Sequence, residues 1–500
     1  MSRTPSEETI PVVVAAGQHT ARDGGVDVLD LAERAARAAL EQAPRLADDL
    51  QRLSFVDSLS SSGKSPAAAL ARRLSLDCRE HERSTVGGNS PQALVTRAAT
   101  DIAAGRLSTV LIAGAEAVAS RRQGVPPPAD ADADDLDPDH VVGDDRDGTC
   151  AGEVAIGLLL PAQIYPMLES VRAHRLGRDH ATHRAELGRL LAPFTEVADA
   201  NPHAWFQQAR TAEEIAEPGP GNRLTAEPYT LRMNAIINVD QGAALLVTSL
   251  AAARRAGVAD RAVFVWSGAG ATDAWFVPSR PRLDASPGIA AATGAALDAA
   301  GLSVDDLDRL ELYSCFPIAV EMAADALGVA TDDPRGLTVT GGLPYFGGPG
   351  NNYTTHGIAT LTDLLREEGG TGLATGLGWF ATKHAAGMYG ASPPPHGFRP
   401  GDTAEAQARI DATALTLADA HVGEATVAAA TVVYDRDGRV VAAPAYLDLP
   451  DGSRLPAAAG SSLLADLAGA ELVGARVEVS GEVPTYRVLE PPPPPKEPVT

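Results

Sequence analysis

Cysteine is the side chain best suited to nucleophilic chemistry, and Cys315 is the candidate among the three cysteines of this sequence. The segment Leu310-Glu311-Leu312 predicts a strand that leads into Tyr313-Ser314-Cys315-Phe316-Pro317. Pro317 predicts the start of a helix that ends before Gly328. A thiol near a helix N-terminus has a lowered pKa and is favoured as the thiolate. The alternative is a buried, inert cysteine, because free cysteine is commonly interior.

A second candidate is the turn Gly87-Gly88-Asn89-Ser90, which precedes a predicted helix that starts at Pro91 and ends at Ala104. The free N–H groups and positive dipole end of such a helix could hold a thioester carbonyl oxygen or another anion. Helix capping also explains Asn89 and Ser90. No base stands beside Ser90 in the sequence to make its hydroxyl a nucleophile.

Two histidines follow glycine-rich segments in the last third of the chain. His356 lies early on a predicted helix, after a loop from Gly341 to Tyr353 whose glycines and prolines permit close backbone approach to a ligand. Lys383 and His384 close another glycine-containing turn. The two histidines are candidate acid/base groups, although a histidine on a helix is more often packed or exposed than catalytic.

These residues define the predicted site. The candidate catalytic residues are Cys315, His356 and His384. The candidate ligand-binding residues are Asn89, Ser90, Tyr313, Gly347, Gly348, Asn351, Asn352 and Lys383.

The elements that must position them indicate an α/β fold with an internal duplication. Apolar runs alternate with helical patterns in the first 120 residues, as in mainly parallel sheets. Asn89 to Gly114 and Asn351 to Gly376 are both 25 positions apart, and each span reads turn, helix and strand. Matched elements at one offset favour duplicated halves that pack as pseudo-symmetric layers.

The rest of the chain reads as an insertion and a β-rich module. Long helical stretches follow Ala151, and short runs of period two follow Pro395. The predicted parts are a first half over 8–120 and 239–262, an insertion over 121–238, a second half over 263–392, a small β-barrel over 400–490 and a proline-rich tail over 491–500.

The segment from Asp130 to Asp147 holds nine aspartates in eighteen residues. It cannot bury a core, so we expect an exposed loop. A calcium site is the alternative, but the carboxylates lack EF-hand spacing.

Composition narrows the classes of function. A formal charge of −24 disfavours nonspecific binding to nucleic acid or anionic lipid. The cysteines are widely separated and indicate neither a disulfide framework nor a metal site. The sequence shows no membrane helix and no signal peptide. We therefore expect a cytoplasmic protein, a monomer or homodimer, that binds a small molecule or another protein and carries no bound cofactor.

Several ordered motifs resemble thiolases, in particular the sterol-carrier type and the thiolase-like protein type 1 family. They are Gly87-Gly88-Asn89-Ser90-Pro91-Gln92, Val110 to Glu116, Asn238 to Ala244, Ser314-Cys315-Phe316-Pro317 and the Gly341 to Tyr353 loop. The resemblance implies a duplicated five-layered thiolase fold over residues 8–392, with a C-terminal domain of oligonucleotide/oligosaccharide-binding (OB) type. It also implies coenzyme A thioesters as substrates, an acetyl-CoA acetyltransferase-like reaction and a place in lipid metabolism.

The sequence departs from the family pattern at the residues that carry the reaction. The nucleophilic cysteine of thiolases aligns with Gly87, or with Gly88 if the turn slips by one residue. The histidine of the Gly-His-Pro motif is replaced by Gly348, and Tyr313-Ser314 stands where the family has an Asn-Glu or His-Asp pair. The late acid/base cysteine has no counterpart near Thr375 to Gly378. Since such residues act as a unit, standard thiolase catalysis is not expected.

Three hypotheses follow. The first is binding of an acyl-CoA or related acyl compound without thiolase turnover. The second is an active acyltransferase or thioester hydrolase with Cys315 as nucleophile and His356 or His384 as base. The third is a non-catalytic assembly or docking protein that acts through its C-terminal domain. Five arginines of the insertion could meet CoA phosphates, although a solvated helix face is the alternative: Arg172, Arg175, Arg178, Arg184 and Arg189.

Overall fold

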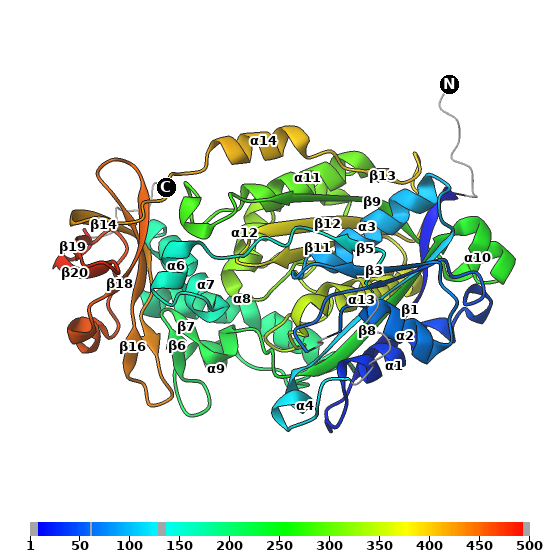
Figure 1. The fold of residues 1–500 in the computed structure, drawn as a ribbon, viewed down its shortest axis with the longest axis horizontal. Helices are drawn as coiled ribbons and strands as arrows, with labels where there is room; N and C mark the ends of the chain where they lie inside the picture. The colour runs from blue at the N-terminus through cyan, green and yellow to red at the C-terminus, as the bar shows by residue number, and fades with distance from the viewer. Residues whose placement is uncertain (1–8, 61–62, 129–136, 494–500) are drawn as a thin grey trace.

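The computed structural model describes residues 9–60, 63–128 and 137–493. Two halves of similar topology form the larger part of the molecule (Figure 1). The elements of the first half are β1 (Pro11–Thr20), α1 (Val28–Leu40), β2 (Arg52–Phe55), α2 (Pro66–Leu74), β3 (Glu80–Ser84), α3 (Ser90–Ala103), β4 (Thr109–Ala117), β8 (Asp240–Ser249) and α10 (Leu250–Ala256). Those of the second half are β9 (Val263–Thr272), α11 (Pro287–Ala300), β10 (Arg309–Glu311), α12 (Pro317–Leu327), α13 (Tyr353–Glu368), β11 (Thr371–Gly378), β12 (Lys383–Gly390) and β13 (Arg399–Pro400).

The strands run in the order β10-β11-β12-β9-β1-β8-β4-β2-β3-β5, where β5 (His140–Val142) comes from the segment that follows β4. The two halves meet where β1 pairs with β9. Helices α3 and α13 contact strands of both halves, so they form the central layer. Helices α1 and α2 cover the outer face of the first-half strands, and α11 covers that of the second half with α12 against it. The predicted duplicated five-layered α/β fold is confirmed.

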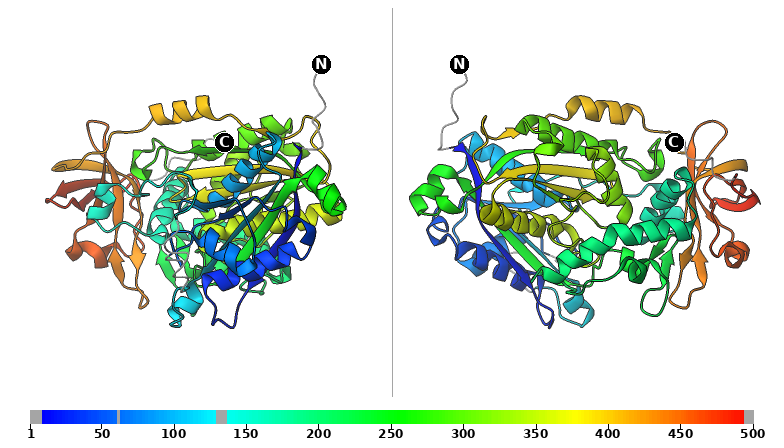
Figure 2. Two further views of the ribbon diagram at one scale, coloured as in Figure 1. Left: turned by 45° about the vertical axis from the view of Figure 1, so that its right-hand side comes forward. Right: turned by 180° about the vertical axis from the view of Figure 1, so that it is seen from behind.

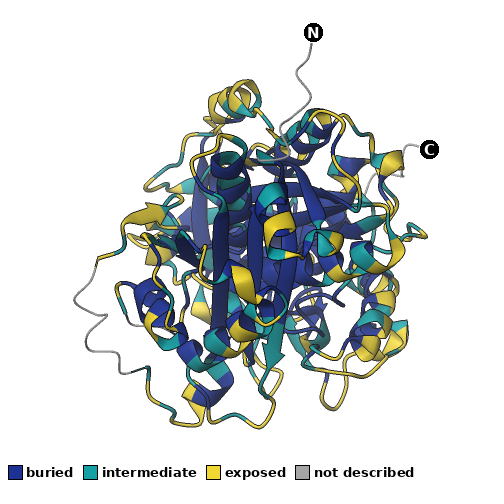
Figure 3. Cartoon of the chain, turned by 90° about the vertical axis from the view of Figure 1, so that its right-hand side faces the viewer, coloured by how far each residue is buried: buried dark blue, intermediate teal, exposed yellow. Residues whose placement is uncertain are grey.

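The core lies within these layers. Buried residues are concentrated in the strands, and exposed residues form the rim (Figure 3). Strands β4 and β8 are buried along their whole length, because helices cover both faces of the sheet. The sheet is therefore a rigid support for the turns at its edges.

The insertion between β4 and β8 packs beside the second half and the C-terminal domain (Figure 2). Its elements are α4 (Val118–Arg122), β5 (His140–Val142), α6 (Ala151–Ala155), α7 (Pro161–Arg175), α8 (His180–Ala200), α9 (Ala212–Ala216), β6 (Leu224–Ala226) and β7 (Tyr229–Thr230). The interior prolines Pro166 and Pro193 do not end their helices, because packing overrides the local preference.

The acidic segment corrects one prediction. Residues 129–136 lie outside the described residues, but strand β5 forms within the span expected to be an exposed loop. It pairs in parallel with β3, Glu82 opposite His140 and Ser84 opposite Val142. The outer edge of β3 offers unpaired backbone groups, which explains why a polar segment with little to bury takes up a strand there.

The C-terminal module contains a closed barrel in the order β14-β17-β18-β20-β19, as the period-two pattern predicted. Helix α14 (Ala404–Ala412) leads to it along α11 (Figure 1). The other elements are β14 (Gly423–Ala430), β15 (Val433–Tyr434), β16 (Val440–Ala442), β17 (Pro444–Asp448), β18 (Arg454–Ala459), a 3-10 helix (Ser461–Leu467), β19 (Arg476–Ser480) and β20 (Thr485–Glu490).

The barrel is joined to the insertion by a second sheet, ordered β16-β15-β6-β7. The Tyr446 hydroxyl donates to the buried carboxylate of Glu153 at 2.6 Å, and Arg454 donates to the carbonyl of Arg280 at 2.6 Å.

Within the described residues, no helix is both long enough and apolar enough to cross a membrane.

Candidate functional site

The Gly87-Gly88 turn lies between the end of β3 and the start of α3, against side chains of the second half. A β-carbon on Gly88 would stand 2.6 Å from Cζ of Tyr313 and 2.6 Å from the carbonyl oxygen of Leu377. A β-carbon on Gly87 would stand 3.0 Å from Cε of Lys383 and 3.2 Å from its Nζ. Asn89 Oδ1 is nearer still to that position, so the space into which a side chain of this turn would project is occupied by Asn89, Tyr313 and Lys383.

Hydrogen bonds from the second half hold this turn in place. The Gly87 N–H donates to Oδ1 of Asn351 at 2.8 Å, and Thr354 donates to the carbonyl of Gly88 at 2.7 Å. The amide of Asn351 donates to the carbonyl of Asp57 at 2.8 Å, and that of Asn352 donates to Gly114 at 2.6 Å. Asn351 and Asn352 thus bind the backbone of the first half rather than pointing an unused amide into a cavity.

Asn89 and Ser90 differ in whether their side-chain oxygens have hydrogen-bond partners. The Ser90 hydroxyl donates to the carbonyl of Thr85 at 2.9 Å, and Ser90 is buried. Asn89 occupies the N-cap position of α3 without a capping bond, and its buried Oδ1 has no hydrogen-bond partner. An unpartnered buried oxygen has lost its hydration without compensation, so Asn89 is the residue of this turn most suited to meet a ligand.

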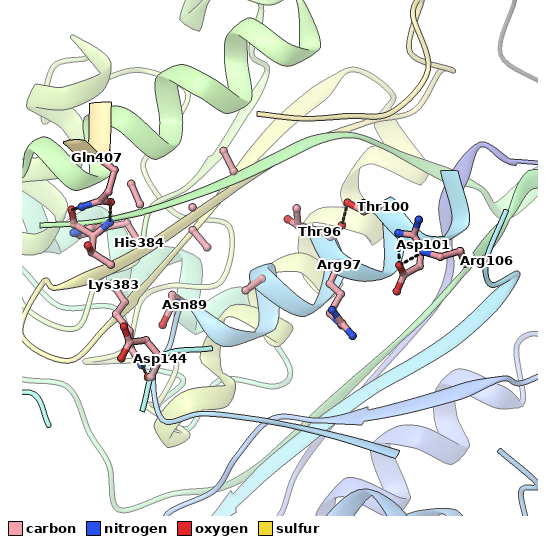
Figure 4. Close-up of a pocket in the computed structure, with 16 residues that line it drawn as sticks. Asn89, Thr96, Arg97, Thr100, Asp101, Arg106, Asp144, Lys383, His384 and Gln407 are labelled. Carbon is pink, nitrogen blue, oxygen red and sulfur yellow. Dashed lines mark hydrogen bonds and ion pairs between the residues drawn. The ribbon is translucent and has the colours of Figure 1, made fainter. Parts of the chain in front are cut away.

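A cavity of about 590 Å³ opens beside Asn89 (Figure 4). Its wall includes the outward face of α3, the end of β9 and the start of β12, with Lys383 near Asn89 and Asp144 and with Gln407 of α14 at the same end (Figure 4). Arg97 and Arg106 also line it, but they pair with Glu82 and Asp101. The remaining lining is mostly small: Ala93, Ala269, Gly270, Ala271 and Ala385.

The Gly341–Tyr353 loop is folded against the insertion and β8. The Gly348 N–H donates to the carbonyl of Ile236 at 2.8 Å, and a β-carbon on Gly348 would lie 3.2 Å from that oxygen. Gly347 has φ +117 and would place a β-carbon against the side chain of Gln241. The glycines of this loop therefore serve close backbone packing.

Comparison with known structures places this geometry in a family. Over 97% of its length the chain matches a monomeric SCP2-thiolase-like protein type 1 from Mycobacterium smegmatis, covering 99% of that chain with 32% sequence identity and a TM-score of 0.83. This chain belongs to the SCP2-thiolase-like protein type 1 family. The resemblance read from the sequence motifs is confirmed.

More distant matches share the fold alone. An Ltp2-ChsH2(DUF35) aldolase is 20% identical with a TM-score of 0.59, over 77% of this chain and 99% of that one. Human mitochondrial 3-ketoacyl-CoA thiolase is 18% identical with a TM-score of 0.56, over 77% of this chain and 100% of that one. No family model and no curated protein matches the chain by sequence.

In this thiolase-like protein, Cys315 does not have the lowered pKa expected from its place before α12. Helix α12 begins at Pro317 as predicted, but the thiol is buried, and burial raises the pKa of Cys315 to about 12. Desolvation of a thiolate in an apolar setting outweighs the helix dipole. The neighbouring Phe316 ring stacks on Tyr165 at 4.5 Å and closes this side of the site.

His356 is fully buried on α13. Its Nδ1 lies 2.8 Å from Oε1 of Gln18, its Nε2 has no partner, and its ring packs edge-on against Phe346. Burial holds the pKa of His356 well below the ordinary value for histidine. Among the described residues, no hydrogen bond joins His356 to Cys315.

His384 belongs to a cluster with the residue types of a hydrolase triad. Its Nε2 lies 2.9 Å from Oδ2 of Asp273 and 3.0 Å from Oγ of Ser286. A triad needs the two imidazole nitrogens to face different partners, whereas here Nε2 meets both and Nδ1 has none. Ser286 caps α11 and Asp273 accepts the Gly288 N–H, so the cluster fixes a helix start.

The predicted phosphate-binding arginines are largely engaged. Arg172 pairs with Glu321 and Asp325, and Arg175 with Asp284. Arg184 pairs with Glu227, and Arg189 with Glu186. Four of the five thus belong to ion pairs, and among the described residues Arg178 is the one without an ion pair. Arg172 and Arg184 are largely buried, so the solvated helix face expected as the alternative does not describe them.

One group of possible metal-binding residues is buried in the insertion and α12: Glu169, His183 and Glu321. His183 Nε2 lies 2.7 Å from Glu169, and the Tyr229 hydroxyl donates to the same carboxylate at 2.6 Å. Arg172 donates to Glu321 at 2.9 Å. These bonds tie the insertion to the second half, although Nδ1 of His183 and Oε2 of Glu321 are buried without a hydrogen-bond partner.

Proposed function

We propose that this protein binds an acyl compound, as an acyl-CoA or a related acyl ligand, without thiolase turnover. The observation that carries the proposal is the filled space beyond Gly87 and Gly88. Where the family resemblance places a thiolate, the structure has the Tyr313 ring and the Lys383 amine. A thiolase needs a group there that accepts the acyl chain as a thioester.

The retained cavity supports binding. About 590 Å³ is enough for a ligand of modest size, and its mostly small lining leaves room beside Asn89. Most arginines of the insertion are held in ion pairs and offer little to the phosphates of coenzyme A. The proposal therefore favours recognition of the acyl and pantetheine part of the ligand over recognition of its phosphates.

The test pairs binding with activity. Calorimetric titration with acetyl-CoA, acetoacetyl-CoA, a medium-chain acyl-CoA and the matching acyl-pantetheine should detect saturable binding. Thiolysis of acetoacetyl-CoA should stay at the rate of a protein-free control. Absence of heat with every ligand at millimolar concentration would reject binding, and thiolysis at a rate typical of the superfamily would reject the loss of turnover.

The rebuilt-site alternative has less support. It needs Cys315 as a nucleophile, whereas that thiol is buried with a raised pKa. If the alternative holds, intact-mass analysis after exposure to acetyl-CoA must show an adduct that disappears in Cys315→Ala.

A further inference from the structure

The amine of Lys383 stands where the side chain of residue 87 would be. Its Nζ is 3.2 Å from the position of a β-carbon on Gly87, although the two residues belong to different halves of the fold. Figure 4 shows Lys383 reaching from the start of β12 toward Asp144, with Asn89 beside it. A nitrogen therefore lies, together with the nearer Oδ1 of Asn89, next to the position where a side chain of Gly87 would begin.

Backbone carbonyl groups, rather than a carboxylate in an ion pair, hold this amine in place. Lys383 is 4% exposed, and its Nζ donates to the backbone carbonyls of Val86 and, at 3.0 Å, of Asp144. Among the described residues the structure shows no salt bridge to Lys383. A neutral amine has two N–H groups, so these two carbonyls can hold it and leave its lone pair uncommitted.

The charged groups facing Lys383 act in opposite senses. Burial disfavours the ammonium form and lowers the pKa of Lys383 to about 8, while the carboxylates of Asp144 and Asp145 act to raise it. The Asp144 carboxylate is itself paired with Arg146 at 2.7 Å, which weakens its effect. The Trp379 ring, 5.8 Å from Nζ, also favours the ammonium form through a cation–π contact. These surroundings leave much of the amine neutral near pH 8.

The residue type matters at this position. The chain has 41 lysine and arginine residues in total, and only three of them are lysines. Lys64 is 66% exposed, Lys496 lies outside the described residues, and Lys383 is the one in the core. A guanidinium could donate to the same carbonyls but cannot be deprotonated in a protein, whereas a buried ammonium can. The position thus carries the cationic side chain that is able to become a nucleophile.

We propose that Lys383 is a nucleophilic amine that captures an aldehyde or ketone group of a molecule bound in the cavity beside Asn89, forming an imine. The choice of a 3-oxoacyl compound as the natural carbonyl rests on the proposed function, whereas the reactivity of the amine does not.

The chemical step is balanced without a further reactant. The nitrogen lone pair forms a bond to the carbonyl carbon, the π electrons move to the oxygen, and one proton passes from nitrogen to oxygen to give a carbinolamine. Loss of that oxygen as water leaves a carbon–nitrogen double bond, which takes up a proton as the iminium ion. An iminium withdraws electrons from the adjacent carbon, as the oxyanion hole does for a thioester in thiolases.

The first experiment compares the three lysines in the intact wild-type chain. The protein is treated briefly with isotopically labelled formaldehyde and cyanoborohydride between pH 6 and 9, and methylation of each lysine is measured by peptide mass spectrometry. At pH 7 an amine with a pKa of about 8 has roughly two hundred times more neutral form than an ordinary lysine. We expect Lys383 to react at least tenfold faster than Lys64 at pH 7, with the ratio falling as the pH rises. Labelling of Lys383 no faster than Lys64 at every pH would overturn the proposal.

The second experiment tests the imine with a keto compound. Acetoacetate followed by borohydride should add to Lys383 the mass of the acid less one oxygen atom. Lys383→Arg keeps the charge and the donors and should lose the adduct, while Lys64→Arg should retain it; circular dichroism verifies that both variants fold. An adduct spread equally over the lysines, or none at Lys383, would count against the proposal. Neither experiment uses an acyl-CoA, so a negative calorimetric titration and a negative labelling result remain separate findings.

Discussion

Asn352 and Gly114 are joined across the two halves of the fold, because the Asn352 amide donates to the Gly114 carbonyl at 2.6 Å. Gly376, the matching position in the second half, packs in the same way. A β-carbon on Gly376 would stand 2.8 Å from the carbonyl oxygen of Gly88. Each half thus packs the turn at its central helix onto a glycine in a strand of the other half, which explains why the repeated motif ends in glycine both times.

Gly114→Ala should destabilise the protein. A β-carbon there would lie 2.5 Å from Oδ1 of Asn352 and 2.8 Å from Cβ of Val56, and neither neighbour is free to move. We expect a loss of about 1–3 kcal/mol in the free energy of unfolding, measured by urea denaturation. Gly294→Ala on α11 is the matched control, because nothing lies within 4 Å of its β-carbon and alanine favours a helix. Equal stability of wild type and Gly114→Ala would contradict this packing.

Gly88→Cys should not restore thiolysis. Its β-carbon would overlap the Tyr313 ring, so the variant should be less stable and inactive on acetoacetyl-CoA. The double variant Gly88→Cys with Tyr313→Ala removes the overlap with the ring but leaves the β-carbon 2.6 Å from the carbonyl oxygen of Leu377, so it should also be less stable than wild type. It should remain inactive, because Gly348 stands where the family resemblance expects the histidine of the Gly-His-Pro motif. Thiolase activity in the single variant would show that the filled space is not the obstacle.

His356→Gln should reduce the acid sensitivity of the fold. Burial holds the pKa of His356 below its unfolded value. The unfolded chain therefore binds the proton more tightly, and stability is lost as the pH falls below about 6.5. Melting temperatures from pH 7 to 5 should fall less steeply in His356→Gln than in wild type. Identical slopes for wild type and His356→Gln would argue against a buried neutral imidazole.

The chain should be a monomer. Strand β5 covers the outer edge of β3, so that edge cannot pair with a second copy of the first half. The similar protein from Mycobacterium smegmatis is also monomeric. Analytical ultracentrifugation over a wide range of concentration should show one species of the mass of a single chain, and a concentration-dependent dimer would contradict this reading.

Helices with clear termination signals were predictable from the sequence. Helix α12 begins at Pro317 and ends before Gly328, where a left-handed C-cap needs glycine. Strand β3 was missed because Glu80 to Ser84 is polar throughout. Its Glu82 is buried by bonds to Ser54 and Arg97, and that partnership depends on residues distant in the chain. Polar cores of this kind leave no periodic apolar signal.

The sequence named candidate residues for the site but did not indicate how they are arranged. Lys383 was recognised as a ligand-binding candidate, but its contact with Gly87 depends on how the halves pack. The thiol of Cys315 was expected to be acidic from its place before a helix, and the surrounding layers reverse that effect through burial. A short sequence motif indicates which helix dipole acts on a residue. How deeply that residue is buried depends on the whole fold.

The sheet shared by β15 and β6 makes the boundary between insertion and barrel continuous in hydrogen bonds. Ala226 pairs with Val433, and the Glu227 N–H donates to the carbonyl of Val432. Cutting the chain between the second half and the barrel would leave backbone donors and acceptors without hydrogen-bond partners on both fragments. Engineering that exchanges one of these parts must therefore exchange the other as well, or leave these backbone groups unpaired, despite the long stretch of sequence that separates them.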